Sequence, residues 1–179
     1  MPINIPQHLR NDNYPPSTQG RRLLWLLAQP LFRFSPRFLY GWRNAVLRAF
    51  GARIGTGVRL YPSVHVMFPW NLQIGDHVVI GGGTRLYTLA PVRIDANVLI
   101  SQGAHLCAGS HDHRQSHFPL VLKPIVIETG TWLAAECFIG PGVTVGAGAV
   151  VAARAVVVRN VEPGKVVAGN PARVVGTSP

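Results

Sequence analysis

Charged side chains are scarce in this chain of 179 residues, and acidic side chains are the scarcest. Asp and Glu together number 7, and charged residues make up 13% of the sequence, which is about half the usual share. A chain this poor in charge and 47% hydrophobic is neither a charge-rich disordered segment nor a charged helical bundle. Its 19 glycines and 15 prolines instead indicate short apolar segments separated by turns.

Cysteines and long apolar runs are also few. The two cysteines, Cys107 and Cys137, form neither a disulfide framework nor a CxxC pair. The apolar run Leu23–Ala28 is far shorter than the roughly 20 residues that cross a bilayer. The start of the chain, Met1–Pro16, is polar and interrupted by prolines, unlike a signal peptide. We therefore expect a cytoplasmic location.

The positive charge is concentrated near the N-terminus. Residues 1–53 hold eight arginines and one acid, whereas residues 54–179 hold nine basic and six acidic groups. A nucleic-acid binder would carry basic and stacking side chains along its whole working face, so no nucleic-acid partner is expected. Residues 21–34 and 37–50 are predicted to form two short basic helices that cap the rest of the fold. The alternative is a surface for anionic lipid at the inner face of the membrane.

Aliphatic residues return every six positions from Ile54 onward, with two slips of two residues and one long gap. A mostly small or β-branched residue follows each of them four positions later, from Val58 through Ser110 to Ala155. Neither a helical period of 3.6 nor strand alternation fits this spacing. The aliphatic series is Ile54, Leu60, Val66, Leu72; Ile74, Ile80, Leu86, Val92; Ile94, Ile100, Leu106; Ile127, Leu133, Ile139, Val145, Val151 and Val157.

This period predicts an all-β fold, a left-handed parallel β-helix with a short helical N-terminal cap. Three six-residue rungs close each triangular coil, with one large and one small side chain pointing inward. The predicted division of the chain is a basic cap segment at 1–53, a β-helix domain at 54–175 with a loop at 111–126, and a tail at 176–179. The two slips place bulges at 72–73 and 92–93, on the corner of the prism from which the long loop also leaves.

Three stretches resemble a known family. They are Ser110–His111–Asp112 at the loop opening, residues 167–174 (VAGNPARV) near the end, and residues 29–34 (QPLFRF) near the start. Together with the hexapeptide ladder they resemble the colanic-acid-type exopolysaccharide acetyltransferases, relatives of the maltose and galactoside O-acetyltransferases. The resemblance implies a homotrimer with active sites between subunits, in which acetyl-CoA donates an acetyl group to a sugar or oligosaccharide hydroxyl without a metal ion.

The loop opening carries the candidate catalytic residues. A sugar hydroxyl needs a base to remove its proton as it attacks a thioester, and the ordinary pKa of histidine suits this task. His111 occupies the position of the family's base. Asp112 could orient the imidazole or hydrogen-bond the acceptor, or it could be an Asx-turn residue that starts the loop. These alternatives remain open in the sequence.

The resemblance also implies positions for the coenzyme. It places Trp132 beside the reactive end, Ala135 and Ala153 along the pantetheine slot, and Arg159 and Arg173 near the nucleotide phosphates. A guanidinium can pair with phosphate through two hydrogen bonds, which suits the last role. Ordinary solvated surface charge is the alternative for the two arginines.

Acceptor binding is assigned to two further residues. Thr88 stands where the family often has an acceptor-binding asparagine on the coil before the loop. His113, within the loop, is expected on the acceptor side.

Two other functions compete with acetyl transfer. His77, His113 and His117 have separations of 36 and 4 residues, close to the three-histidine zinc pattern of the γ-type carbonic anhydrases that share this fold. The second alternative is a non-catalytic β-helix scaffold whose basic N-terminus docks on a membrane or a partner protein.

Overall fold

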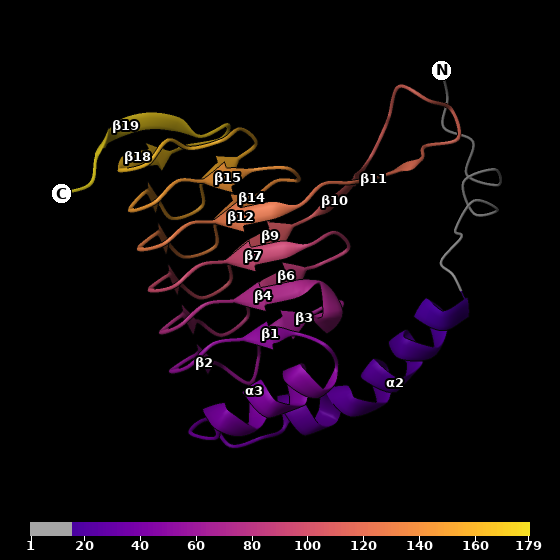
Figure 1. Cartoon of the computed structure of the whole chain (residues 1–179). Helices are drawn as coiled ribbons and strands as arrows, with labels where there is room; N and C mark the ends of the chain where they lie inside the picture. The colour runs from indigo at the N-terminus through magenta and orange to yellow at the C-terminus, as the bar shows by residue number, and fades with distance from the viewer. Residues whose placement is uncertain (1–15) are drawn as a thin grey trace.

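The computed structural model describes residues 16–179, and the first part of the predicted cap segment, residues 1–15, lies outside the described residues. Short strands stack into the parallel coils of a β-helix, and two helices lie across its N-terminal end (Figure 1). The predicted left-handed parallel β-helix with a helical N-terminal cap is confirmed, and most of its strands pair in parallel with the strand one coil away. The helices are α2 (Pro16–Arg33), α3 (Tyr40–Ala49) and the short 3-10 helix η1 (Pro69–Asn71).

Three sheets form the faces of the prism, and the chain visits them in the order A, B, C. Sheet A contains β1 (Arg53–Ile54), β4 (Leu72–Ile74), β7 (Val92–Ile94), β12 (Ile125–Ile127) and β15 (Thr144–Val145). Sheet B contains β2 (Arg59–Leu60), β5 (Val79–Ile80), β8 (Leu99–Ile100), β13 (Trp132–Leu133), β16 (Val150–Val151), β18 (Lys165–Ala168) and β19 (Arg173–Thr177). Sheet C contains β3 (His65–Val66), β6 (Arg85–Tyr87), β9 (His105–Cys107), β14 (Phe138–Ile139) and β17 (Val156–Val157).

The core is the column of inward side chains that the six-residue period predicts. Every aliphatic residue of the series is buried, and so are the small residues four positions later, with one exception. Ser110 is exposed, because the chain has already left the prism at β10 (Gly109–His111). Ala108 is fully buried instead and completes that coil before the excursion begins.

All three expansions lie on the corner between sheet C and sheet A, as predicted. The extra residues themselves lie earlier than expected, because residues 72–73 and 92–93 belong to the regular strands β4 and β7. The preceding turns are lengthened instead, by η1 on one coil and by residues 88–91 on the next. On the third coil β10 pairs antiparallel with β11 (Leu120–Leu122), and this hairpin projects away from the prism (Figure 1).

The two predicted helices are present, and α2 begins at Pro16, five residues earlier than expected. They cover the open end of the first coil through a few directional contacts. Trp25 Nε1 donates a hydrogen bond to the Val66 carbonyl at 2.9 Å, and Arg43 is fully buried and donates to the Leu60 carbonyl at 2.6 Å. No helix among residues 16–179 is both long and apolar enough to span a bilayer.

Candidate active site

His111 lies at the root of the loop, where strand pairing and ring stacking fix its position. It ends β10 opposite Leu120 of β11, and its ring stacks on Phe118 with 4.6 Å between centroids and 7° between planes. Its Nδ1 lies 2.9 Å from the Phe118 carbonyl oxygen. Phe118 adopts a φ of 51°, which bulky side chains rarely do, so these contacts hold an uncommon backbone conformation in place.

The Phe118 carbonyl determines the tautomer of His111. A carbonyl oxygen can only accept a hydrogen bond, so Nδ1 carries the proton when the imidazole is neutral. The basic lone pair is then on Nε2. A histidine whose one nitrogen is anchored by a backbone carbonyl has the other nitrogen set up for proton transfer.

Asp112 is engaged by the loop itself. Its Oδ1 accepts a hydrogen bond from the Arg114 backbone N–H at 3.0 Å, and its Oδ2 accepts one from Gln115 Nε2 at 2.9 Å. These two bonds, the one from Gln115 foremost, lower the pKa of the Asp112 carboxyl. The geometry is that of an Asx turn, which favours the loop-forming alternative for this residue.

A recess of about 410 Å³ lies at the loop root. His111, Asp112 and the exposed His113 line it, and Lys123 and Pro141 form part of its wall. The predicted base and the predicted acceptor-side histidine thus face the same space. A hydroxyl group entering this recess would meet two imidazole groups, the Asp112 carboxylate, and the charged groups of Arg114 and Lys123.

Thr88 has a different environment from the one that an acceptor-binding residue needs. Its side chain is fully buried, and its hydroxyl accepts a hydrogen bond from the Phe68 N–H at 2.8 Å and donates one to the Phe68 carbonyl at 2.9 Å. This pair of bonds ties two coils together at the lengthened corner. The hydroxyl therefore supports the coil and presents no surface to a sugar.

The residues assigned to the coenzyme lie on the later coils. Trp132, in sheet B, is 45% exposed and donates from Nε1 to Ser101 Oγ at 3.1 Å. Ala135 and the exposed Ala153 occupy the corner between sheets B and C on successive coils, where the Arg154 N–H donates to the Ala135 carbonyl at 2.9 Å. Small side chains here leave the backbone accessible along one edge.

The two arginines assigned to the phosphates are both exposed. Arg159 follows β17 on the corner between sheets C and A, and Arg173 begins β19 at the end of sheet B. They lie on different parts of the final coils, so a single chain does not bring them to one edge.

A single chain also keeps the predicted base apart from the predicted pantetheine slot. His111 belongs to the corner between sheets C and A, whereas Ala135 and Ala153 lie on the corner between sheets B and C. The whole width of sheet C separates these two corners. The predicted residues therefore form two half-sites on one protomer.

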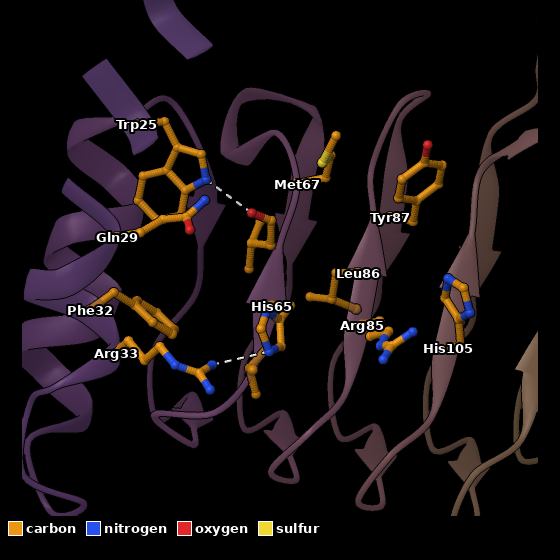
Figure 2. Close-up of a pocket in the computed structure, with 12 residues that line it drawn as sticks. Trp25, Gln29, Phe32, Arg33, His65, Met67, Arg85, Leu86, Tyr87 and His105 are labelled. Carbon is orange, nitrogen blue, oxygen red and sulfur yellow. Dashed lines mark hydrogen bonds between the residues drawn. The ribbon is translucent and has the colours of Figure 1, made fainter. Parts of the chain in front are cut away.

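Sequence reasoning missed a second recess, a groove between α2 and the outer face of sheet C (Figure 2). His65, Arg85 and His105 stand in register on three neighbouring strands of its floor. Each immediately precedes an aliphatic residue of the ladder and so points outward. That spacing was the available signal, although nothing in it shows that α2 forms the opposite wall.

The three histidines of the zinc alternative do not gather on one chain. His77 lies on the corner between sheets A and B, whereas His113 and His117 belong to the loop on the corner between sheets C and A. Within residues 16–179, no group of three His, Cys, Asp or Glu side chains is arranged to hold a metal ion.

A β-helix of hexapeptide repeats with a histidine at the root of a loop excursion, together with the solved acetyltransferase that it matches, makes this chain a hexapeptide-repeat acyltransferase. A solved hexapeptide-repeat acetyltransferase from Vibrio cholerae O1 biovar eltor, complexed with acetyl coenzyme A, matches with a TM-score of 0.86 and 30% identity, covering 94% of this chain and 92% of that one. No protein-family profile matches the chain.

Sequence relatives identify the family within this class. The protein assigned as the colanic acid biosynthesis acetyltransferase WcaF of Escherichia coli K12 is 45% identical over 154 residues, which cover 86% of this chain and 85% of that protein. The galactoside O-acetyltransferase of the same organism is 27% identical over 136 residues, covering 74% and 67%. The chain belongs to the WcaF family of acetyltransferases, and the resemblance seen in the sequence is confirmed.

Proposed function

We propose that the protein transfers the acetyl group of acetyl-CoA to a sugar hydroxyl during the synthesis of a cell-surface polysaccharide, with His111 as general base. The observation that carries the proposal is the anchored imidazole at the loop root, whose Nδ1 faces the Phe118 carbonyl. The named acetyltransferase relatives and the acetyl-CoA complex of the Vibrio cholerae protein support the donor and the reaction class.

The proposed chemistry is direct transfer within a ternary complex. Nε2 of His111 takes the proton of the acceptor hydroxyl while that oxygen attacks the thioester carbonyl. The tetrahedral intermediate then collapses, the carbon–sulfur bond breaks, and the imidazolium returns its proton to the departing thiolate. The products are the O-acetyl sugar and free CoA.

Neither cysteine suits a covalent acetyl-enzyme. Cys137 is fully buried in the coil, and burial raises the pKa of its thiol to about 12, so the nucleophilic thiolate is rare at neutral pH. The Cys107 thiol is engaged with the Gly109 carbonyl at 3.1 Å. Both observations favour transfer without a protein-bound intermediate.

Acetyl-CoA would lie along the edge formed by Ala135 and Ala153, with its thioester near Trp132. The exposed indole of Trp132 offers an apolar surface to the reactive end, and the small alanines leave space for a thin pantetheine chain. Arg159 and Arg173 would pair with the phosphates, whose charge and geometry suit guanidinium groups.

The acceptor and donor half-sites would meet in a homotrimer. Because His111 and the edge of Ala135 and Ala153 lie on opposite sides of sheet C in one chain, a neighbouring protomer would supply the other half of the site. The loop that carries His111 projects away from its own prism, which suits a role at a subunit boundary (Figure 1).

The N-terminal segment would contact an anionic membrane surface. Residues 16–53 contain seven arginines and no acidic residue, and several large apolar side chains of this segment are exposed, so the surface combines the two features of an interfacial helix. Binding to vesicles with acidic lipid, but not to neutral vesicles, would support this contact. The exposed side chains include Leu23, Leu24, Leu27, Leu31, Phe34, Phe38 and Trp42.

The decisive experiment for the function is a thiol-release assay with acetyl-CoA and a panel of sugar acceptors. The proposal expects CoA release that depends on an acceptor and a mass increase of one acetyl group on that acceptor. A protein that binds no CoA in calorimetry and acetylates no sugar in the panel would instead be the non-catalytic scaffold.

A further inference from the structure

The groove between α2 and sheet C has the volume of a small-molecule binding site. Its cavity volume is about 440 Å³, within the roughly 300–1,000 Å³ typical of small-molecule sites. Trp25, Phe32 and Arg33 of α2 form one wall, and the outer face of sheet C forms the floor (Figure 2). The groove thus depends on α2 lying beside β3 at the edge of sheet C (Figure 2).

The polar groups of this groove are strongly biased toward positive charge. Arg33, Arg85, His65 and His105 line it, and no Asp or Glu is among the described lining residues. An Arg33 Nη1 atom lies 3.0 Å from His65 Nε2, and the backbone of Arg85 is paired between those of His65 and His105. Within the described chain, the Arg85 guanidinium forms no hydrogen bond or ion pair. The groove therefore holds two guanidinium groups and two imidazoles without a carboxylate among the described lining residues.

The pKa values of the two imidazoles are lowered in this groove. Burial first, and then the charges of Arg33 and Arg85, lower the pKa of His65. Burial and then Arg85 lower the pKa of His105. A bound anion would relieve this repulsion, because it would pair with Arg85 and favour the protonated form of both rings.

Aromatic and apolar groups accompany the cations. Tyr87 is 36% exposed and stands edge-on to His105, with 6.4 Å between ring centroids. Trp25 and Met67 lie on the same side of the groove (Figure 2). An exposed aromatic ring beside a guanidinium suits a ligand that has both an apolar sugar face and an anionic substituent.

We propose that this groove binds the anionic substituent of the acceptor, so that the preferred acceptor is a saccharide carrying a carboxylate or phosphate group. The inference rests on the proposed function and specifies its substrate class. Sheet C connects the two recesses, because β9, which contributes His105, is followed within two residues by β10, which ends at His111. An acceptor held at Arg85 would extend along this face toward the base.

The test measures binding to the full-length protein without acetyl-CoA, by calorimetry, for glucose, glucuronate and glucose 1-phosphate. We expect at least one of the two anionic sugars to bind about tenfold or more tightly than glucose. Tighter binding of glucuronate would identify the carboxylate, and tighter binding of the phosphate ester would identify the phosphate. Equal affinity of all three sugars, or no binding of either anionic sugar, would overturn the proposal.

Variants assign the binding to the groove. Arg85→Gln should weaken the preferred anionic sugar about tenfold, whereas Arg53→Gln should leave the affinity unchanged. Arg53 is the matched control because it also begins a strand and is exposed, on sheet A. Unchanged affinity in Arg85→Gln would place the anion elsewhere and contradict the proposal. An unchanged circular dichroism spectrum would show that the variant keeps its fold.

The failure of this inference is distinguishable from failure of the proposed function. Acetyl transfer to neutral and anionic sugars with equal kcat/KM would leave the transferase function standing and remove the anion site. Anion binding that depends on Arg85 in a protein that acetylates nothing would keep the site and remove the function.

Discussion

A single backbone carbonyl sets the chemistry of His111. The contact from Nδ1 to the Phe118 oxygen fixes the neutral tautomer, and the stacked Phe118 ring fixes the plane of the imidazole. These two contacts arise within a span of eight residues, so the hairpin alone orients the His111 ring. Asp112 does not contact the imidazole in these bonds. Its carboxylate instead closes the turn at which the loop begins.

Replacing His111 by alanine should abolish the proposed general-base catalysis while leaving the donor slot intact. We expect kcat to fall about 10²–10⁴-fold, the usual contribution of a positioned acid or base. The affinity for CoA, measured by calorimetry, should stay at the wild-type value, because the slot lies on another corner of the prism. His77→Asn is the matched control, since His77 is an exposed histidine on the corner between sheets A and B, and it should retain most of the activity. Turnover within a few-fold of wild type in His111→Ala would contradict this role.

His105 should make the stability of the protein depend on pH. Its pKa is lowered in the folded chain by burial and by Arg85, so between that value and its ordinary pKa of about 6.5 the unfolded chain binds more protons. Stability from this group is therefore complete above the ordinary pKa and is lost as the pH falls through the folded value.

The measurement is the Tm at about pH 7.5 and about pH 5. The fall in Tm on acidification should be smaller for His105→Asn than for wild type, since asparagine stays neutral. His113→Asn serves as the exposed control and should behave like wild type. An identical fall in Tm in all three proteins would show that His105 does not contribute to the pH dependence of stability.

At the scale of elements, the helical cap is attached to the β-helix by Arg43 of α3. Its guanidinium donates to the carbonyls of Leu60, Pro36 and Arg37 and to the Ser35 hydroxyl, at 2.6–2.8 Å. The side chain is fully buried, and so is its bond to the Leu60 carbonyl, whereas the other three bonds are partly buried. One residue thus connects α3, the turn between the helices, and the first coil.

Arg43→Met should therefore destabilise the protein strongly. Leaving the buried Leu60 carbonyl without its donor costs about 1–3 kcal/mol, so we expect a loss of about 2 kcal/mol in the free energy of unfolding. Arg43→Lys should recover only part of this, because an ammonium lacks the planar fork that reaches all four oxygens. Urea denaturation followed by circular dichroism measures both values, and a loss below about 1 kcal/mol for Arg43→Met would refute the proposed attachment.

The sequence predicts the coils well because their inward positions are set by a strict spacing. Ile54, Leu60 and Val66 obey the same rule as Ile139, Val145 and Val151, since each must fill the same narrow interior. The rule fails at Ser110, where the period continues although the chain has already turned outward at Gly109. A repeat reports which residue would face inward, and it does not report where the chain leaves the repeat.

The site is less predictable because it depends on how separate elements meet. The spacing places Thr88 beside the lengthened corner. Only the structure shows that its hydroxyl is hydrogen-bonded to the backbone N–H and carbonyl of Phe68. Likewise, the outward positions of Arg85 and His105 follow from the ladder, whereas the approach of Arg33 depends on the angle at which α2 crosses sheet C. Local periodicity carries no information about that angle.

At the scale of the whole molecule, the residues of the proposed site lie on two corners of one protomer. His111 stands on one corner of the prism and the small-residue edge on another, with sheet C between them. Closed cyclic assembly would place the His111 corner of each chain against the slot of its neighbour, so that every boundary forms one site. The account therefore predicts that catalysis belongs to the assembly.

Mixed assemblies of two inactive variants test this claim most directly. His111→Ala removes the base, and Ala153→Trp fills the proposed slot, so each variant alone should be inactive. When the two are co-expressed with different tags and trimers containing both are purified, each mixed trimer should hold one complete site out of three, which gives about a third of wild-type activity. A site contained within one chain would give no activity in any mixture, and that result would contradict the account.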